Sequence, residues 1–371
     1  MRIPVCVPLL GKKEKEYVLN CLNDHWISSS GKYIPAFEES FSHYCGRKYG
    51  IATTNGTTAL HLGLAALKVR PGDEVIMPTF TIASTAFAVI YCGGKPIFVD
   101  STKDTWNIDV NKIEEKITKR TKAIMPVHIY GNPCDMDVIM KLAKKYHLYV
   151  IEDAAEAHGA EYKGRKVGGI GDVGCFSFYG NKIITCGEGG MIVTNNKTIT
   201  ARCRLLKNLS FLENKRFWHK EIGFNYRMTN IQAALGLAQF EQIEKLIEKR
   251  RKNAGIYNSL LSRVRGLTLP IEKAHTRNVY WMYGLLVRKE FGMNRKRLIK
   301  KLYEKGIETR TFFWPMHEQP ILKKLGLLSR ERYPIAEDIS QRGLYLPSSS
   351  GLIQSEIEYI CETIEKISKG R

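Results

Sequence analysis

The chain has 371 residues, of which 44% are hydrophobic and 25% charged, so we expect a globular protein with one large domain and a smaller one. No apolar run approaches the roughly 20 residues that cross a bilayer, and the nine cysteines form no CxxC pair, which argues against a disulfide framework and a zinc site. The formal charge of +20 suits an anionic partner, either nucleic acid or an anionic small molecule.

The N-terminal segment, residues 1–18, contains a short apolar stretch that Pro4 and Pro8 interrupt and that charged residues follow. This pattern is a poor match to a signal peptide. We therefore expect a cytoplasmic protein with reduced thiols, no bound metal and no membrane association.

Between residues 51 and 195 the hydrophobic pattern alternates between the strand period and the helix period. Apolar runs of strand length occupy residues 74–78, 95–100, 122–130 and 148–155, and helical patterns occupy residues 83–94, 111–117 and 136–147. Near-continuous apolar strands separated by helices predict a mainly parallel sheet covered on both faces, an open, doubly wound α/β domain. Ligands of such sheets bind at the carboxyl ends of the strands.

One long helical pattern, residues 229–261, is interpreted as the connector that leaves this domain. A strand at 279–288, a helix at 295–306, an aromatic loop at 307–320 and a closing helix at 355–367 predict a smaller α+β domain. The predicted domains are therefore 1–240 and 241–371. The densest basic stretches, 245–253 and 294–306, have helical periodicity, so solvated helix faces explain them and we expect no nucleic-acid partner.

Three short segments carry candidate chemistry. Gly56 and Thr57 directly precede an apolar helical pattern, where exposed N–H groups favour an anion, although a plain helix cap explains the same residues. Asp153 ends a buried strand, where its carboxylate needs a cation: the protonated ring nitrogen of a cofactor or a Lys or Arg side chain. Lys182 stands between an aromatic run and a glycine cluster, which favours a desolvated, nucleophilic amine over a solvated surface lysine.

A glycine motif nearby is a false lead. Gly169, Gly171 and Gly174 spell GxGxxG, but a strand-like segment follows them, whereas a dinucleotide-binding fingerprint leads into a helix. An anion-binding helix start, a strand-end aspartate and a secluded lysine on a doubly wound sheet are instead the contacts that pyridoxal 5′-phosphate (PLP) requires.

With these residues in view, the chain resembles the DegT/DnrJ/EryC1/StrS sugar aminotransferases. The likeness covers nearly the whole chain and rests on long motifs at residues 26–41, 55–60, 151–160, 176–195, 223–242 and 306–320. It implies an aspartate aminotransferase-like α/β fold (PLP fold type I), with a mainly parallel mixed sheet and a smaller C-terminal α+β domain. It also implies a homodimer with active sites at the subunit interface.

The resemblance assigns roles to cofactor-binding residues. Lys182 would bond to the cofactor aldehyde, Asp153 would pair with the pyridine nitrogen, and Glu156 would lie near the 3-hydroxyl. The residues implied for the phosphate are Gly56, Thr57 and Ser177, joined by Asn225 of a neighbouring subunit. Phe80 would stack on the ring, with a core aromatic as the equal alternative.

The implied reaction moves the amino group of L-glutamate, giving 2-oxoglutarate, to a nucleotide-linked 4-keto-6-deoxy sugar. GDP-4-keto-6-deoxy-D-mannose is the expected acceptor; a UDP- or dTDP-linked 4-keto-6-deoxyglucose or a keto-deoxyoctulosonate are alternatives, and a PLP-binding regulatory protein without turnover is the non-enzymatic one. His158, Arg310 and His317 are our candidates for the sugar nucleotide. The structural alternatives are that His158 is a hydrogen-bonded core histidine and that Arg310 stacks on the aromatic side chains of its loop.

Overall fold

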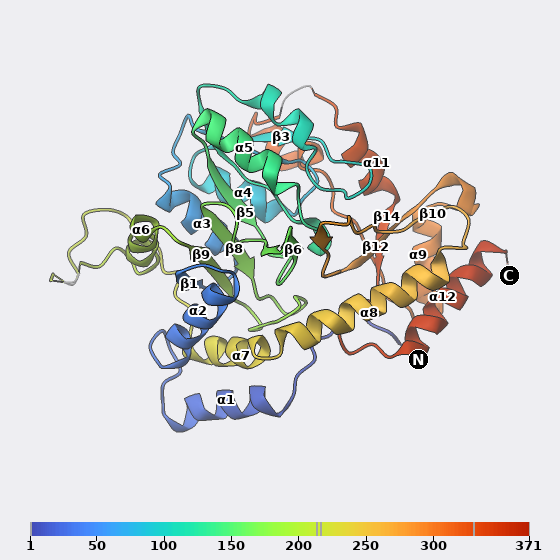
Figure 1. The fold of residues 1–371 in the computed structure, drawn as a ribbon, viewed down its shortest axis with the longest axis horizontal. Coiled ribbons are helices and arrows are strands. Elements are labelled where there is room, and N and C mark those ends of the chain that lie inside the picture. The colour runs from blue at the N-terminus through green and yellow to red at the C-terminus, as the bar shows by residue number, and fades with distance from the viewer. Residues whose placement is uncertain (1, 213, 216, 329–330, 371) are drawn as a thin grey trace.

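The computed structural model describes residues 2–212, 214–215, 217–328 and 331–370 (Figure 1). Its centre is a seven-stranded sheet in the order β1-β9-β8-β5-β4-β2-β3. The strands are β1 (Tyr49–Thr53), β2 (Glu74–Pro78), β3 (Lys95–Val99), β4 (Thr121–Ile124), β5 (Tyr149–Asp153), β8 (Val173–Ser177) and β9 (Gly190–Thr194). Neighbours from β8 to β3 are parallel, and β9 is antiparallel to both β1 and β8. The predicted mainly parallel mixed sheet is confirmed.

Helices cover both faces of this sheet. Successive residues of a strand point to opposite faces, and on β8 the thiol of Cys175 donates to the carbonyl of Ala59 in α3 (Gly56–Ala66), while the ring of Phe176 packs on Phe41 of α2 (Tyr33–Tyr44). The helices α4 (Ala83–Tyr91) and α6 (Lys197–Lys207) pack on α3, and α5 (Met136–Tyr146) lies on β4 and β5. The sheet is therefore buried on both sides, as its apolar strands require.

A second sheet lies on the right of Figure 1. It is antiparallel, in the order β10-β12-β14-β13, with β10 (Leu267–Thr268), β12 (Tyr283–Val287), β13 (Arg310–Thr311) and β14 (Gly343–Leu346). Its helices are α9 (Arg295–Glu304) and α12 (Gln354–Ser368). The remaining elements are α1 (Lys12–Asn23), α10 (Pro320–Lys324), α11 (Pro334–Arg342) and a small sheet of β6 (Glu161–Tyr162), β7 (Arg165–Lys166) and β11 (Thr276–Arg277).

The prediction of one helix over residues 229–261 is wrong. The chain forms α7 (Asn230–Phe240) and α8 (Ile243–Leu261), separated where Gln242 leaves the helical region with φ −119° and ψ 17°. The side chains of Gln239 and Gln242 both donate to the buried carboxylate of Glu14 in α1. A buried carboxylate needs such donors, and this long-range partner is invisible in the helical periodicity.

The helix α8 packs into two hydrophobic clusters. Its first half lies in the cluster around the large sheet and its second half in the cluster around the small sheet. The residues concerned are Ile243, Leu246 and Ile247, then Ala254, Tyr257 and Leu261. Because α8 joins both clusters, the division into domains 1–240 and 241–371 stays a prediction.

Two shorter predictions differ from the structure. The helix expected over residues 111–117 is a pair of 3₁₀ turns, Val110–Lys112 and Glu114–Lys116, because so short a segment forms a stable α-helix only with strong tertiary support. The strand expected over 122–130 ends at Ile124, shortly before Pro126, which has no N–H for a sheet ladder. Within the ranges that the structure describes, no helix is long and apolar enough to cross a membrane.

Candidate active site

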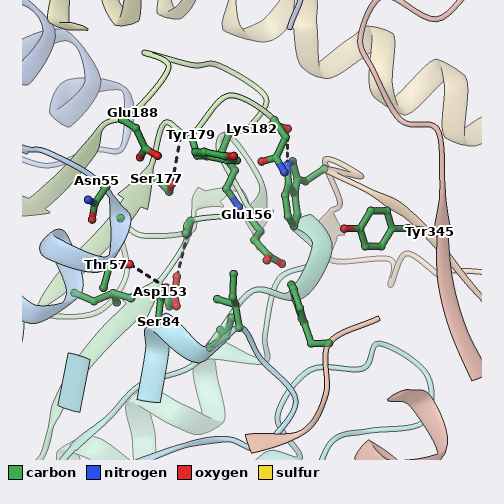
Figure 2. A pocket seen from close by; sticks show the side chains of 18 residues that line it. Asn55, Thr57, Ser84, Asp153, Glu156, Ser177, Tyr179, Lys182, Glu188 and Tyr345 are labelled. Carbon is green, nitrogen blue, oxygen red and sulfur yellow. Dashed lines mark hydrogen bonds between the residues drawn. The ribbon is translucent and has the colours of Figure 1, made fainter. Parts of the chain in front are cut away.

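A cavity of about 370 Å³ opens at the carboxyl ends of β5 and β8 (Figure 2). Six residues predicted from the sequence line it: Gly56, Thr57, Asp153, Glu156, Ser177 and Lys182. The other lining residues are Asn55, Leu60, Ile82, Ser84, Val127, Ala155, Tyr179, Asn181, Glu188, Trp281, Phe313 and Tyr345. Three carboxylates and a single amine are the charged groups among these lining residues.

The amine of Lys182 is secluded, as its aromatic surroundings predict. The residue is 9% exposed, and Nζ lies 3.6 Å from the centroid of the Trp281 ring. Among the described residues, none forms a hydrogen bond or an ion pair with this nitrogen. Burial lowers the pKa of Lys182, although the carboxylates of Glu156 and Asp153 oppose the shift. An amine with these properties can act as a nucleophile and as a base near neutral pH.

The carboxylate of Asp153 is buried without a cation bonded to it in the described part of the chain. Its Oδ2 accepts from Thr85 Oγ1 at 2.9 Å, and its Oδ1 accepts from the Ala155 N–H at 3.2 Å. Burial raises the pKa of Asp153, and the hydrogen bond from Thr85 only partly offsets this. A cationic group placed in the cavity beside this carboxylate would be stabilised.

The glycine-rich segment of residues 168–174, which contains the GxGxxG motif, holds the neighbouring carboxylate, that of Glu152. The N–H groups of Gly168, Ile170 and Gly171 donate to it at 2.6–2.7 Å. The fourth donor is His128 Nε2 at 3.2 Å, whose tautomer is fixed because its Nδ1 accepts from the Cys134 N–H. Burial alone would raise the pKa of Glu152, but these bonds lower it. The motif therefore anchors the end of β5 and leads into β8, consistent with a false dinucleotide fingerprint.

Glu156 is the second buried carboxylate on the cavity. Its Oε2 accepts from the N–H of Tyr130 at 2.8 Å. Burial raises the pKa of Glu156, and the nearby Lys182 amine opposes this. The side chain is therefore able to hold a proton at pH values where an exposed glutamate is ionised.

The start of α3 forms an anion cradle. Asn55 caps the helix by accepting from the Thr58 N–H, whereas the N–H groups of Gly56 and Thr57 belong to the first turn, which has no intrahelical acceptors. A Cβ atom at Gly56 would lie only 2.7 Å from Cβ of Ser177. The contact requires glycine, and it brings the Ser177 hydroxyl of β8 against the helix start.

A second helix start completes the cradle. The Thr57 hydroxyl donates to Ser84 Oγ at 2.9 Å, in the first turn of α4. Two helix N-termini thus face one end of the cavity, an arrangement that favours a phosphate or carboxylate.

Two predicted residues lie in the core instead of on the cavity. Phe80 is fully buried and packs against the rings of Phe312 and Phe313, which is the alternative that the sequence left open. His158 is fully buried beside Phe176, and neither of its ring nitrogens has a hydrogen-bond partner among the described residues. Burial, with the Lys182 amine, lowers the pKa of His158 to about 3, so the ring is neutral.

The three other predicted residues also lie outside the cavity of this chain. Arg310 is exposed and lines a separate hollow with Lys296 and Lys300. His317 contacts Thr79 through Nδ1 at 2.8 Å, which ties the aromatic loop to the end of β2. Asn225 is exposed.

Sequence reasoning missed the aromatic walls of the cavity, Tyr179, Trp281, Phe313 and Tyr345. Tyr179 lies in the segment that drew attention to Lys182. The others come from the second sheet and its loops, and no local pattern marks them as cavity residues. The dense hydroxyls of residues 79–85 are the signal that could have identified Ser84 and Thr85.

Comparison with known proteins gives consistent matches along the chain. The model of the DegT/DnrJ/EryC1/StrS aminotransferase family matches residues 8–365. GDP-perosamine synthase of Caulobacter vibrioides is 46% identical over 99% of this chain and 98% of its own length, and that of Escherichia coli O157:H7 is 47% identical over 98% of both chains. Streptococcus pneumoniae Spr1654, solved in its PLP form, is 26% identical with a TM-score of 0.93, covering 100% of this chain and 99% of its own.

Proposed function

This chain belongs to the DegT/DnrJ/EryC1/StrS aminotransferase family, and we propose that it uses PLP to transfer the amino group of L-glutamate to C4 of GDP-4-keto-6-deoxy-D-mannose, forming GDP-perosamine. Two relatives named GDP-perosamine synthase, more than 45% identical over nearly the full length, support this substrate. The observation on which this proposal depends is that the buried amine of Lys182, the buried carboxylate of Asp153 and the anion cradle line the same cavity.

The residues of the cavity fit PLP. The cradle of Gly56, Thr57 and Ser177 suits its phosphate, and no cation among the described residues pairs with the buried Asp153, a place that the protonated pyridine nitrogen would fill. Glu156 offers a second carboxyl group for the ring hydroxyl. When bound, PLP supplies an aldehyde that reacts with amines and a cationic ring that withdraws electrons from the adjacent carbon.

In the proposed mechanism Lys182 moves the proton. Its desolvated Nζ takes a proton from the α carbon of glutamate and, in the second half of the cycle, delivers one to C4 of the sugar. Asp153 keeps the charge of the ring nitrogen in place through both halves. Trp281, against which Nζ rests, excludes water from the amine. One site thus serves two unlike anionic substrates in turn.

We propose that a second copy of the chain completes the site. Phosphate, glutamate and a nucleotide diphosphate are all anionic, yet Lys182 is the one cationic side chain among the described lining residues. Asn225 lies exposed, outside the cavity of its own chain. It is therefore free to reach the phosphate cradle of a partner in a homodimer.

We also propose that the reaction takes place in the cytoplasm, with the product used for O-antigen or another surface glycan. All nine cysteines are free thiols, the state that a reducing compartment maintains.

The test is a two-step assay of purified protein. Glutamate alone should convert bound PLP to its amine form, seen as a change in visible absorbance, whereas a regulatory binder would show no change. The loaded protein should then aminate the GDP-linked 4-keto sugar in preference to UDP- and dTDP-linked ones. Lys182→Ala should lack both the absorbance of the linked cofactor and turnover; normal turnover by this variant would refute the assignment.

A further inference from the structure

We propose that Arg250 is a positioning residue for the proposed transamination: its buried guanidinium fixes Trp281 and the N-terminal segment at Cys6, and through them the backbone that carries Lys182. The role of Lys182 rests on the proposed function. The hydrogen bonds that join Arg250 to Trp281 and Cys6, which we call the Arg250 clamp, do not depend on it.

The burial of Arg250 is unusual for an arginine. The residue lies on α8 and is 3% exposed. Its three hydrogen bonds go to neutral groups: Nε donates to Ser350 Oγ at 3.0 Å, Nη1 to the Trp281 carbonyl at 2.5 Å and Nη2 to Cys6 Sγ at 3.6 Å. Within the described residues no carboxylate pairs with it. A buried charge that lacks a counter-ion is costly, so a purely structural role would be better served by a neutral side chain.

The contacts of Arg250 converge on the residue before the lysine. The indole Nε1 of Trp281 donates to the Asn181 carbonyl at 2.8 Å, and the Cys6 thiol donates to the same oxygen at 3.3 Å. Both donors to this carbonyl are therefore held by Arg250. The same tryptophan also presents its ring to Nζ of Lys182 at 3.6 Å. One guanidinium thus orients the wall on which the amine rests and the turn from which it projects.

The clamp also has an electrostatic effect. Burial is the largest cause that lowers the pKa of Lys182, and the positive charge of Arg250 lowers it further. The groups that oppose it are Glu156 and Asp153 on the β5 side and Cys6 on the N-terminal segment, while the neighbouring His158 ring is neutral. Arg250 is thus a fixed positive charge facing an amine that must lose its proton to react.

The experiment compares Arg250→Met, which removes the charge, with Arg250→Lys, which keeps the charge but cannot span three acceptors. Arg251→Met is the matched control, because Arg251 is the next residue of α8 and pairs outward with Glu272. In the cofactor-free proteins, brief acetylation over a pH series followed by mass spectrometry of the Lys182 peptide measures the pH midpoint of the amine. PLP binding is measured separately by absorbance.

Arg250→Met should move the Lys182 midpoint to higher pH by about half a unit or more and weaken PLP binding at least about tenfold. Arg250→Lys should keep the midpoint and still weaken PLP binding, and Arg251→Met should match wild type in both. An unchanged midpoint in Arg250→Met, or wild-type PLP affinity in Arg250→Lys, overturns the proposal. If Arg250→Met does not fold, Arg250→Lys decides alone. Failure of the wild-type protein to bind PLP would refute the proposed function instead, and the acetylation midpoints would still judge the clamp.

Discussion

At the scale of single residues, the cavity gathers three buried ionisable groups, none of which has an ion-pair partner among the described residues. Asp153 and Glu156 are buried with raised pKa values, and Lys182 is buried with a lowered one. Each shift disfavours the charged form and so costs folding free energy. Groups kept in this state are typical of sites that bind a charged ligand.

This cost gives a pH-dependent prediction for the cofactor-free protein. The ordinary pKa of a glutamate is 4.5, and burial raises that of Glu156. The folded state therefore binds this proton more tightly than the unfolded chain does, and the stability it contributes at low pH is lost as the pH rises through the raised value. Glu156→Gln mimics the protonated form and keeps an acceptor for the Tyr130 N–H.

In thermal unfolding, Glu156→Gln should match wild type near pH 4.5 and become more stable than wild type toward pH 8, by on the order of 1 kcal/mol. Glu188→Gln, which changes an exposed carboxylate on the same cavity, is the matched control. A constant gap for Glu156→Gln would mean that the carboxylate is not destabilised by burial.

Residue types in context were sufficient to predict that Lys182, Asp153 and the helix start at Gly56 and Thr57 would meet at one cavity. Each stands at the end of a strand or the start of a helix, and the sheet brings those ends together. The sequence did not show that Phe80 and His158 point into the core. Both residues lie in loops, where no hydrophobic period marks which side chains are buried. Both rings lie in the core behind the cavity wall.

At the scale of secondary structure elements, the contact between the start of α3 and the end of β8 decides whether the cradle forms. Gly56→Ala would place a Cβ atom 2.7 Å from Cβ of Ser177, and neither Cβ can move without its backbone. We expect PLP affinity to fall at least about tenfold and the free energy of unfolding by about 1–3 kcal/mol.

Gly255→Ala is the matched control for this helix glycine. No atom of the described residues outside the local helix backbone lies within 4 Å of a Cβ atom built at Gly255 on α8, so the substitution should leave PLP affinity unchanged and stabilise the helix by up to about 1 kcal/mol. Absorbance titration with PLP and thermal unfolding measure both quantities. Wild-type PLP affinity in Gly56→Ala would rule out the proposed cradle.

Hydrophobic period predicted the strands β2, β3, β4, β5 and β12 and the helices α3, α4, α5, α9 and α12, but it did not predict the break between α7 and α8. It depends on Glu14, more than 200 residues earlier in the chain, which collects the side chains of Gln239 and Gln242. The glycine motif shows the opposite case. The strand that follows the motif argues against a dinucleotide site from the sequence alone. That its N–H groups bind the Glu152 carboxylate does not follow from the sequence, because Glu152 lies on another strand.

At the scale of the whole molecule, the shortage of cations on the cavity predicts sites shared between subunits. Asn225→Asp should weaken cofactor binding by placing a negative charge near the phosphate of the partner's site. In a mixed dimer of Lys182→Ala and Asn225→Asp chains, one site would carry both changes and the other neither.

At a PLP concentration too low to load the Asn225→Asp protein, mixing the two variants and allowing subunits to exchange should therefore restore activity, to about one quarter of wild type when half the dimers are mixed. Mixing two Lys182→Ala preparations provides the baseline. If Asn225 served its own chain, each site in a mixed dimer would carry one defect, and activity would stay at that baseline.

The sequence could not predict which aromatic side chains line the cavity, because three of them come from a distant part of the chain. Trp281, Phe313 and Tyr345 reach the large sheet only because the C-terminal part of the chain folds back over it. The same long-range packing leaves Arg310 in a separate hollow, although it lies three residues from Phe313.

The helix α8 links these two parts in a way that limits how the protein can move. Its 19 residues form one continuous helix, about 28 Å long, and its two halves pack in different hydrophobic clusters. A hinge motion between the two sheets would have to bend this helix or separate one half from its cluster. Substrate entry is thus left to the peripheral loops, while the architecture behind them stays stiff.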